Sequence, residues 1–305
     1  MTEAAEFTTN GTPANTRRSR VYPAMAGAVT ALAFSSVFVK KLEGLDVPAV
    51  VVAFYRVALA ALLLAPFTLW LKRKELIAMR RSEYALLLAA GLCLAVHFGA
   101  WIASLEYIPI AASVVLVDSH PILVAIASYF VLGEVLAPRS LAGAILGIIG
   151  TVVICKDGFL GMRSDLLGDG LALLGAFAMV GYLLAGRKVR NHVSLLGYAT
   201  PVYLACSLFL LMWAGVSGSR VWPYGRLEWI LFAALAIVPT ILGHTVLNWA
   251  IRHVPATGIS ISFLGEPVVA AALAFFFFGQ KPSTATLIGS TLVLAGIYLT
   301  LTRRR

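Results

Sequence analysis

Ten long apolar runs, separated by short polar segments, make up most of this 305-residue chain. Each run has about 18 to 25 residues, the length at which an α-helix crosses a bilayer. The runs lack the alternating pattern of membrane-barrel strands, and in lipid only a helix satisfies the backbone of an open chain. We therefore predict ten transmembrane helices, near residues 22–39, 48–71, 83–105, 109–132, 138–155, 167–186, 195–217, 227–251, 256–279 and 283–302.

The composition indicates an all-α integral membrane protein. Hydrophobic residues account for 60% of the chain and charged residues for 12%, against about 45–50% and about 25% in soluble domains. Ten spans use roughly 200 residues, so the remainder is too short for a nucleotide-binding domain, which argues against an ATP-driven pump. Cys93, Cys155 and Cys206 lie in or beside apolar runs without metal-ligand spacing. We expect free thiols, no metal and no cofactor.

Lysine and arginine are distributed unevenly between the two sets of alternate loops. The set that includes both termini holds 16 of them, and the other set holds seven. Because cytoplasmic loops carry the excess of basic residues, both termini are predicted to be cytoplasmic, with residues 1–21 as a tail before a retained first span. The net charge of +10 then reflects topology and contact with the lipid of a bacterial inner membrane, rather than nucleic-acid binding.

The two halves of the chain repeat each other at a shift of 146 residues. The shift carries the fourth predicted span onto the ninth and the fifth onto the tenth. Because a five-span repeat reverses its orientation in the membrane, residues 22–156 and 167–302 are predicted to form two inverted five-helix repeats. This design is typical of alternating-access transporters, whose substrate site lies near the midplane between the repeats. Five proline or glycine pairs coincide: Pro109 and Pro255, Pro121 and Pro267, Gly133 and Gly279, Gly143 and Gly289, and Gly150 and Gly296.

The same residues carry a resemblance that extends over about residues 22–302. The first half contains Tyr107-Ile108-Pro109, Ser119-His120-Pro121 and Gly133-Glu134, the second half contains His253-Val254-Pro255, Gly265-Glu266-Pro267 and Gly279-Gln280, and the second span contains Phe54-Tyr55-Arg56. In order and spacing these motifs resemble the EamA-type transporters of the drug/metabolite transporter superfamily. Gln280 departs from the pattern, since a glutamate like Glu134 is frequent there.

The resemblance implies a secondary transporter, and many members of the family export amino acids or related metabolites. Some relatives move nucleotide-sugars, triose phosphates or drugs. It also implies a substrate cavity lined mainly by spans 1, 3, 4, 6, 8 and 9. On this cavity geometry Tyr182 in span 6 and Ser35-Ser36 in span 1 are further candidates for contact with the substrate.

Ionisable side chains within the apolar runs are costly in hydrocarbon and are therefore candidates for function. His120 and Glu266 are equivalent under the repeat, and each directly precedes a proline that opens the helix backbone. Glu266 is a candidate for binding a substrate amine or accepting a proton, with His120 as its partner. The alternative is that both side chains only satisfy the opened backbone. The full set comprises Arg56, His97, Asp118, His120, His244 and Glu266.

Asp118 is the second candidate for proton coupling. It lies two residues before His120, and on a continuous helix the two side chains would point about 200° apart. We therefore expect that they do not both face the same narrow cavity. Either one of the two lines the cavity while the other pairs between helices, or Asp118 lies near the outer surface, where the fourth span begins.

Two histidine–tryptophan pairs lie in the third and eighth spans. His97 and Trp101 are four residues apart and share a helix face. His244 lies one position from the repeat equivalent of His97, and Trp249 follows just over one turn later. All four are candidates to line the substrate cavity, where indole faces suit ammonium or aromatic groups. The alternative is an interfacial tryptophan belt with histidines that bond across helices.

Four further positions are predicted to gate or to support the structure. Arg56 lies early in the second span, from which it could snorkel outward or cap a gate by pairing with an acid. Glu134 is expected to pair with a cytoplasmic basic residue, with Arg139 near in sequence. Pro121 and Pro267 are expected to supply bending points for the two repeats.

These observations favour a transporter of small neutral or zwitterionic metabolites, above all amino acids, with export as the expected direction. Phosphorylated substrates would require more buried lysine or arginine than the chain has. An exporter of cationic compounds is the alternative within transport. A membrane enzyme is disfavoured because no nucleophile or metal motif is present, and a channel because no filter loop is evident. The chain is compatible with a monomer and with a homodimer.

Overall fold

The computed structural model describes residues 14–108, 110–134, 137–159, 165–278 and 281–301. Predicted features at residues 1–13, at Pro109 and at Gly279-Gln280 lie outside this part of the chain. The elements in order are α1 (Ala14–Glu43), α2 (Ala49–Ala78), α3 (Arg81–Ser104), α4 (Ile110–Val117), α5 (His120–Leu132), α6 (Pro138–Phe159), α7 (Leu166–Val189), α8 (Leu195–Val216), α9 (Arg226–Leu235), the π-helix η1 (Ala236–Thr245), α10 (Val246–Ala250), α11 (Ala256–Phe263), α12 (Glu266–Phe278) and α13 (Thr284–Leu301).

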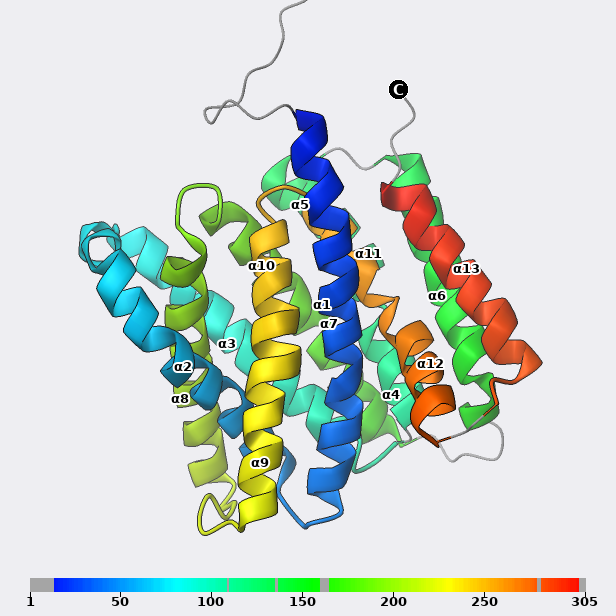
Figure 1. The fold of residues 1–305 in the computed structure, drawn as a ribbon, viewed down its shortest axis with the longest axis horizontal. Coiled ribbons are helices and arrows are strands. Elements are labelled where there is room, and N and C mark those ends of the chain that lie inside the picture. Colours follow the sequence, from blue (N-terminus) through cyan, green and yellow to red (C-terminus); the bar gives the residue numbers. More distant parts are fainter. Residues whose placement is uncertain (1–13, 109, 135–136, 160–164, 279–280, 302–305) are drawn as a thin grey trace, which may run out of the picture.

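The described residues form a helical bundle, as the apolar pattern predicted (Figure 1). Nine helical segments in this part of the chain are long and apolar enough to cross a membrane, and Pro138–Ile154 is a shorter apolar helix. Many large apolar side chains face outward, among them Trp70, which is 82% exposed. Such a surface would drive aggregation in water, so the exposed faces are those of a multi-pass membrane protein.

The fourth and ninth spans are each interrupted ahead of a proline. Residues 118–119 separate α4 from α5, and residues 264–265 separate α11 from α12. Pro121 and Pro267 follow these breaks, and a proline offers no N–H to the preceding turn. The bounds of α4 and α5 fall on those of α11 and α12 at the shift of 146 residues. In Figure 1 the chain rises from α4 to α5 but descends from α11 to α12.

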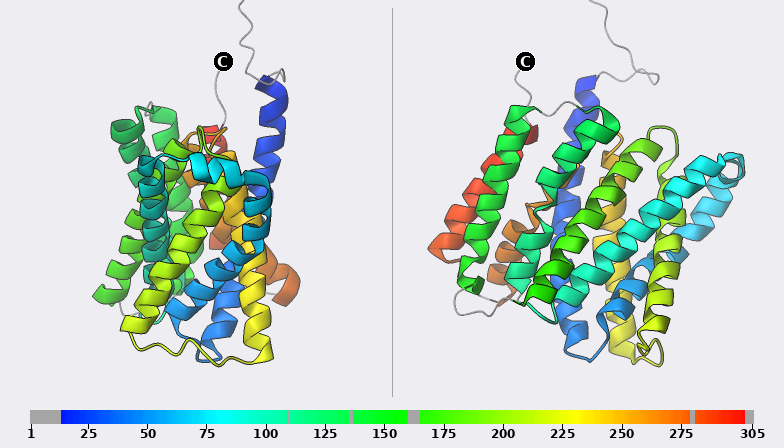
Figure 2. Two further views of the ribbon diagram at one scale, coloured as in Figure 1. Left: turned by 90° about the vertical axis from the view of Figure 1, so that its left-hand side faces the viewer. Right: turned by 180° about the vertical axis from the view of Figure 1, so that it is seen from behind.

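α6 and α13 form a close pair at one edge of the bundle (Figures 1 and 2). Glycines let their backbones touch. A Cβ atom added at Gly150 would lie 2.6 Å from the carbonyl oxygen of Gly289, and one added at Gly289 would lie 2.5 Å from that of Gly150. Small residues of this kind allow helices to approach closely in lipid, where apolar side chains gain little by leaving their surroundings.

The other helices enclose the centre of the bundle. α3 packs extensively against α7 and α8, α2 against α8, and α1 against η1. The start of α1 and the end of α13 lie at the same end of the molecule (Figure 1). The two interrupted spans and η1 therefore face one central region, where side chains from both halves of the chain meet.

Candidate functional site

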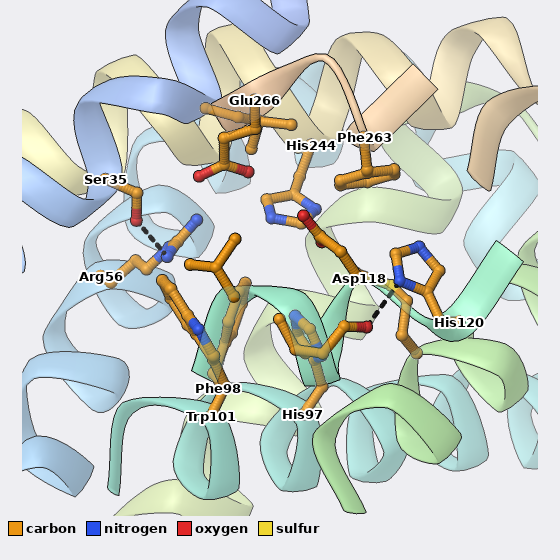
Figure 3. Close-up of a pocket in the computed structure, with 14 residues that line it drawn as sticks. Ser35, Arg56, His97, Phe98, Trp101, Asp118, His120, His244, Phe263 and Glu266 are labelled. Carbon is orange, nitrogen blue, oxygen red and sulfur yellow. Dashed lines mark hydrogen bonds between the residues drawn. The ribbon is translucent and has the colours of Figure 1, made fainter. Parts of the chain in front are cut away.

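A central cavity of about 40 Å³ lies between the helices of the described chain, which is enough space for a few water molecules. Its walls come from α1, α2, α3, α7, η1 and the breaks at α4–α5 and α11–α12 (Figure 3). These are spans 1, 2, 3, 4, 6, 8 and 9, so Arg56 adds the second span to the expected set. The lining residues are Leu32, Ser35, Arg56, His97, Phe98, Trp101, Val114, Val117, Asp118, His120, Met179, His244, Phe263 and Glu266.

Arg56 is the buried cation of the cavity. The residue is 1% exposed, so it does not snorkel to the surface as its position near the start of α2 suggested. Its Nε donates to Thr240 Oγ1 at 3.0 Å and its Nη1 donates to Ser35 Oγ at 2.9 Å. Its Cζ lies 4.1 Å from the centroid of the Phe98 ring. These contacts replace water around the charge and hold the guanidinium in the cavity wall.

The break between α4 and α5 brings Asp118 and His120 to the same cavity. Their expected separation of about 200° assumed a continuous helix, and it does not apply because α4 ends before Asp118 and α5 begins at His120. Asp118 points toward His244 in Figure 3. Glu266, which begins α12, lies above Arg56 with its carboxyl group directed toward it. The cavity thus holds both predicted carboxyl groups.

His120 bonds to the opened backbone and also lines the cavity. Its Nδ1 lies 2.9 Å from the carbonyl oxygen of Val117, the backbone group that Pro121 leaves unbonded. Its Nε2 is buried and has no hydrogen-bond partner among the described residues, and the same holds for Asp118 Oδ2 and Trp101 Nε1. Buried polar atoms are nearly always bonded, so three unpartnered atoms in one cavity indicate a place for polar ligand atoms or water.

Aromatic rings form much of the cavity wall. His97 Nδ1 lies 2.9 Å from the carbonyl oxygen of Gly175 in α7, which fixes its ring. The rings of His97 and Trp101 are nearly parallel, with 6.5 Å between centroids. The His244 ring lies 5.2 Å from that of Phe98 and 5.8 Å from that of Phe263. The histidines are therefore held by backbone and ring contacts, with their edges at the cavity.

Tyr182 and Trp249 are not among the residues that line the cavity. The Tyr182 hydroxyl accepts a hydrogen bond from Asn248 Nδ2 at 2.5 Å, and its ring packs near that of Tyr198. The Trp249 ring packs against His253 at 5.2 Å between centroids. The prediction that Tyr182 and Trp249 contact the substrate is not supported by the position of the cavity, and it stays a prediction.

Glu134 forms an ion pair that joins the two halves of the chain at one end of the bundle. Its Oε1 accepts from Arg187 Nε at 2.8 Å, and Arg187 also donates to the carbonyl oxygen of Ile251. The expected basic partner is therefore Arg187 of α7, which only the packing of α7 beside α5 brings near. The pair is about four-fifths buried on each side, so it is only partly screened by solvent.

We expect Glu134→Gln to lower the free energy of unfolding by about 1–2 kcal/mol, because it leaves the Arg187 charge partly buried without its counterion. The measurement is thermal unfolding of the purified protein in detergent. Glu43→Gln is the matched control, since its ion pair with Lys40 is exposed and such pairs contribute about 0–1 kcal/mol. Equal effects of the two variants would contradict a stabilising role for the Glu134–Arg187 pair.

Several lining residues were not singled out from the sequence. Phe98, Val114, Met179 and Phe263 are apolar in apolar spans and carry no sequence signal by themselves. Thr240, which binds Arg56, does carry a weak signal, because it is a polar residue directly after a proline within an apolar run. The π-helix that contains it presents both Thr240 and His244 to the cavity region, and π-turns are frequent at functional sites.

Comparison with known proteins gives a match to the EamA-like transporter family over residues 20–156 and again over residues 166–302. An uncharacterized transporter of Archaeoglobus fulgidus is 28% identical, over 81% of this chain and 86% of its own. A probable amino-acid metabolite efflux pump of Salmonella typhimurium is 26% identical over 56% of this chain and 60% of its own.

An S-adenosylmethionine uptake transporter of Rickettsia bellii is 24% identical, over 80% of each chain. A solved crystal structure matches with a TM-score of 0.76 at 20% identity, covering 92% of this chain and 96% of that one. The structural likeness supports the fold. The named relatives are transporters, which fits a transport role better than an enzymatic one.

Proposed function

This chain belongs to the EamA-like transporter family, and we propose that it is a secondary transporter that exports amino acids across the inner membrane of a bacterium. The observation that carries the proposal is the central cavity. It is lined from both halves of the chain, and it combines charged groups, unpartnered polar atoms and aromatic rings. Such convergent polar groups within an otherwise apolar wall are typical of a small-molecule site.

Alternating access is the proposed mechanism. The matching bounds of α4–α5 and α11–α12, together with their opposite directions in Figure 1, support two inverted repeats. The excess of lysine and arginine in the set of loops that includes both termini supports cytoplasmic termini. The breaks before Pro121 and Pro267 lie at the cavity, so bending there would move the cavity walls directly. Rocking of one repeat against the other would then expose the same site to either side of the membrane.

An amino acid is the proposed substrate because the cavity offers groups of both charge signs. Glu266 is the proposed partner of the substrate ammonium group, and Glu266 and Asp118 are the candidates to carry a coupled proton. Trp101, His97 and His244 would contact the substrate side chain. The relative named as an amino-acid metabolite efflux pump supports this substrate class and direction, whereas the relative named for S-adenosylmethionine is an uptake protein.

A cationic compound is the second candidate substrate. Two carboxyl groups and several ring faces in one cavity would suit an organic cation. The buried charge of Arg56 opposes it, since a cation without a carboxylate would meet that guanidinium unpaired.

The direct test uses the full chain in proteoliposomes preloaded with a mixture of amino acids. Uptake of labelled amino acids is measured at equal pH and then with a pH gradient, with empty liposomes as the control. We expect exchange at equal pH, and a response to the gradient above the leak of empty liposomes if a proton is coupled. Folded protein that exchanges no amino acid under either condition would overturn the proposal, and exchange of a labelled organic cation would then favour the second candidate.

A further inference from the structure

The Arg56 guanidinium carries a charge that its protein neighbours do not neutralise by contact. Within the described chain, no carboxylate oxygen lies within 4.0 Å of it. Its direct partners are two hydroxyl groups and a phenyl ring, all of them neutral. An arginine has five N–H donors, and these hydrogen bonds use two. A buried cation with neutral partners and free donors at a cavity is suited to receive an anion.

The hydroxyl contacts orient Arg56. Thr240 Oγ1 donates its own hydrogen to the carbonyl oxygen of Leu235 at 2.8 Å. Its only hydrogen is thereby used, so toward Arg56 it presents a lone pair and acts as an acceptor. Ser35 Oγ accepts from Nη1 on the opposite side, from α1. Nε is thus bonded to η1 and Nη1 to α1, and the Phe98 ring packs against the guanidinium. These contacts fix the orientation of the guanidinium before a ligand binds.

The carboxyl group of Glu266 lies near the Arg56 guanidinium but forms no direct ion pair with it among the described contacts. Glu266 also lines the cavity, and its carboxyl group faces the guanidinium in Figure 3. The two charges attract each other across the cavity without a direct ion pair among the described contacts. A site with a fixed cation and a separate carboxyl group matches a molecule that carries both charges close together.

We propose that Arg56 binds the carboxylate of the transported amino acid, with the guanidinium donors forming a paired hydrogen bond to its two oxygens. This proposal rests on the proposed function and names the group that selects α-amino acids over amines. The Glu266 carboxyl group binds the ammonium end, and Trp101 contacts the side chain, which favours apolar and aromatic amino acids. Arg56 is thus a specificity-determining residue in addition to a structural one.

The experiment compares ligands that differ only at the carboxylate. Wild-type protein in proteoliposomes exchanges labelled phenylalanine, and unlabelled phenylalanine, phenylalaninamide and phenethylamine are tested as competitors. A charge-assisted hydrogen bond contributes about a 10- to 100-fold difference in affinity, so phenylalanine should compete better than the amide by at least about tenfold. An amide that competes as well as the acid would overturn the proposal without any variant.

The variants separate recognition from structure. Arg56→Gln should weaken competition by phenylalanine and leave that by the amide nearly unchanged, so that the preference falls to about one. Arg56→Lys keeps the charge but loses the planar pair of donors, and should retain a reduced preference. If Arg56→Gln does not fold, an unchanged preference in Arg56→Lys overturns the proposal.

Arg190→Gln is the matched control. Arg190 is also a buried arginine, 2% exposed, but it is bound to backbone carbonyl oxygens of Asn248 and Val193 and does not line the cavity. Any loss of exchange in that variant should affect acid and amide equally. An equal loss for both ligands in Arg56→Gln would likewise show a structural role alone and overturn the proposal. Folded wild-type protein that exchanges no amino acid overturns the proposed function itself, and this inference with it.

Discussion

Replacing Glu266 by glutamine is expected to leave expression and folding unchanged but to abolish transport or make it insensitive to pH. The carboxyl group lies at the break between α11 and α12 and faces the cavity. Glutamine has nearly the same shape, yet it can neither carry a negative charge toward a substrate amine nor accept a proton. The loss of one charge-assisted contact corresponds to at least about a tenfold fall in exchange.

The measurement is amino-acid exchange in proteoliposomes at equal pH and with a pH gradient, alongside the amount of folded protein. Glu106→Gln is a matched control, because Glu106 is exposed and does not line the central cavity. Asp118→Asn tests the second carboxyl group in the same assay. Normal, pH-dependent transport by the Glu266→Gln protein would remove Glu266 from the mechanism.

Replacing Gly150 by valine is expected to cause the largest loss of stability. A Cβ atom at this position would lie 2.6 Å from the carbonyl oxygen of Gly289 and 2.7 Å from the amide nitrogen of Val293. Both are backbone atoms of α13, so no side-chain rotation relieves the clash and the helices must separate. Overpacking costs about 1–3 kcal/mol, and valine at a backbone contact should reach the upper end of that range.

Thermal unfolding in detergent, followed by size-exclusion chromatography, measures this effect. Gly170→Ala is the control, because a Cβ atom there has no neighbour within 4 Å and alanine favours the helix. Since α6 and α13 do not line the cavity, any Gly150→Val protein that folds should keep its preference among ligands. A variant as stable as the control would mean that α6 and α13 do not need their close contact.

The helical spans were predictable because their cause is local. An apolar run of the right length forms a helix in lipid whatever its neighbours are. The prolines at 121 and 267 likewise act on the turn directly before them, which is why both interruptions fall where the sequence placed them. The repeat was visible because both copies keep their glycines and prolines at the same spacing.

The membership of the cavity was predictable only in part. His97, Trp101, His120, His244 and Glu266 all lie in its wall, as does Asp118. The polar character of these residues in apolar spans was the signal. Apolar lining residues such as Phe98 gave no such signal, because a side chain that faces a cavity and one that faces lipid have the same composition.

The sequence by itself determined the membrane class, the helical spans, the repeated halves and the family. The membrane class and the spans follow from the length of the apolar runs, which determines one helix at a time. The repeat and the family follow from the order and spacing of short proline and glycine motifs. Only the tertiary structure decided which polar groups meet. In the fold, Arg56 donates hydrogen bonds to hydroxyl groups of α1 and η1, and Glu134 forms an ion pair with Arg187. Asp118 and His120 line the same cavity. Those contacts join residues up to 184 positions apart, and helix packing, not local pattern, sets which of them come together.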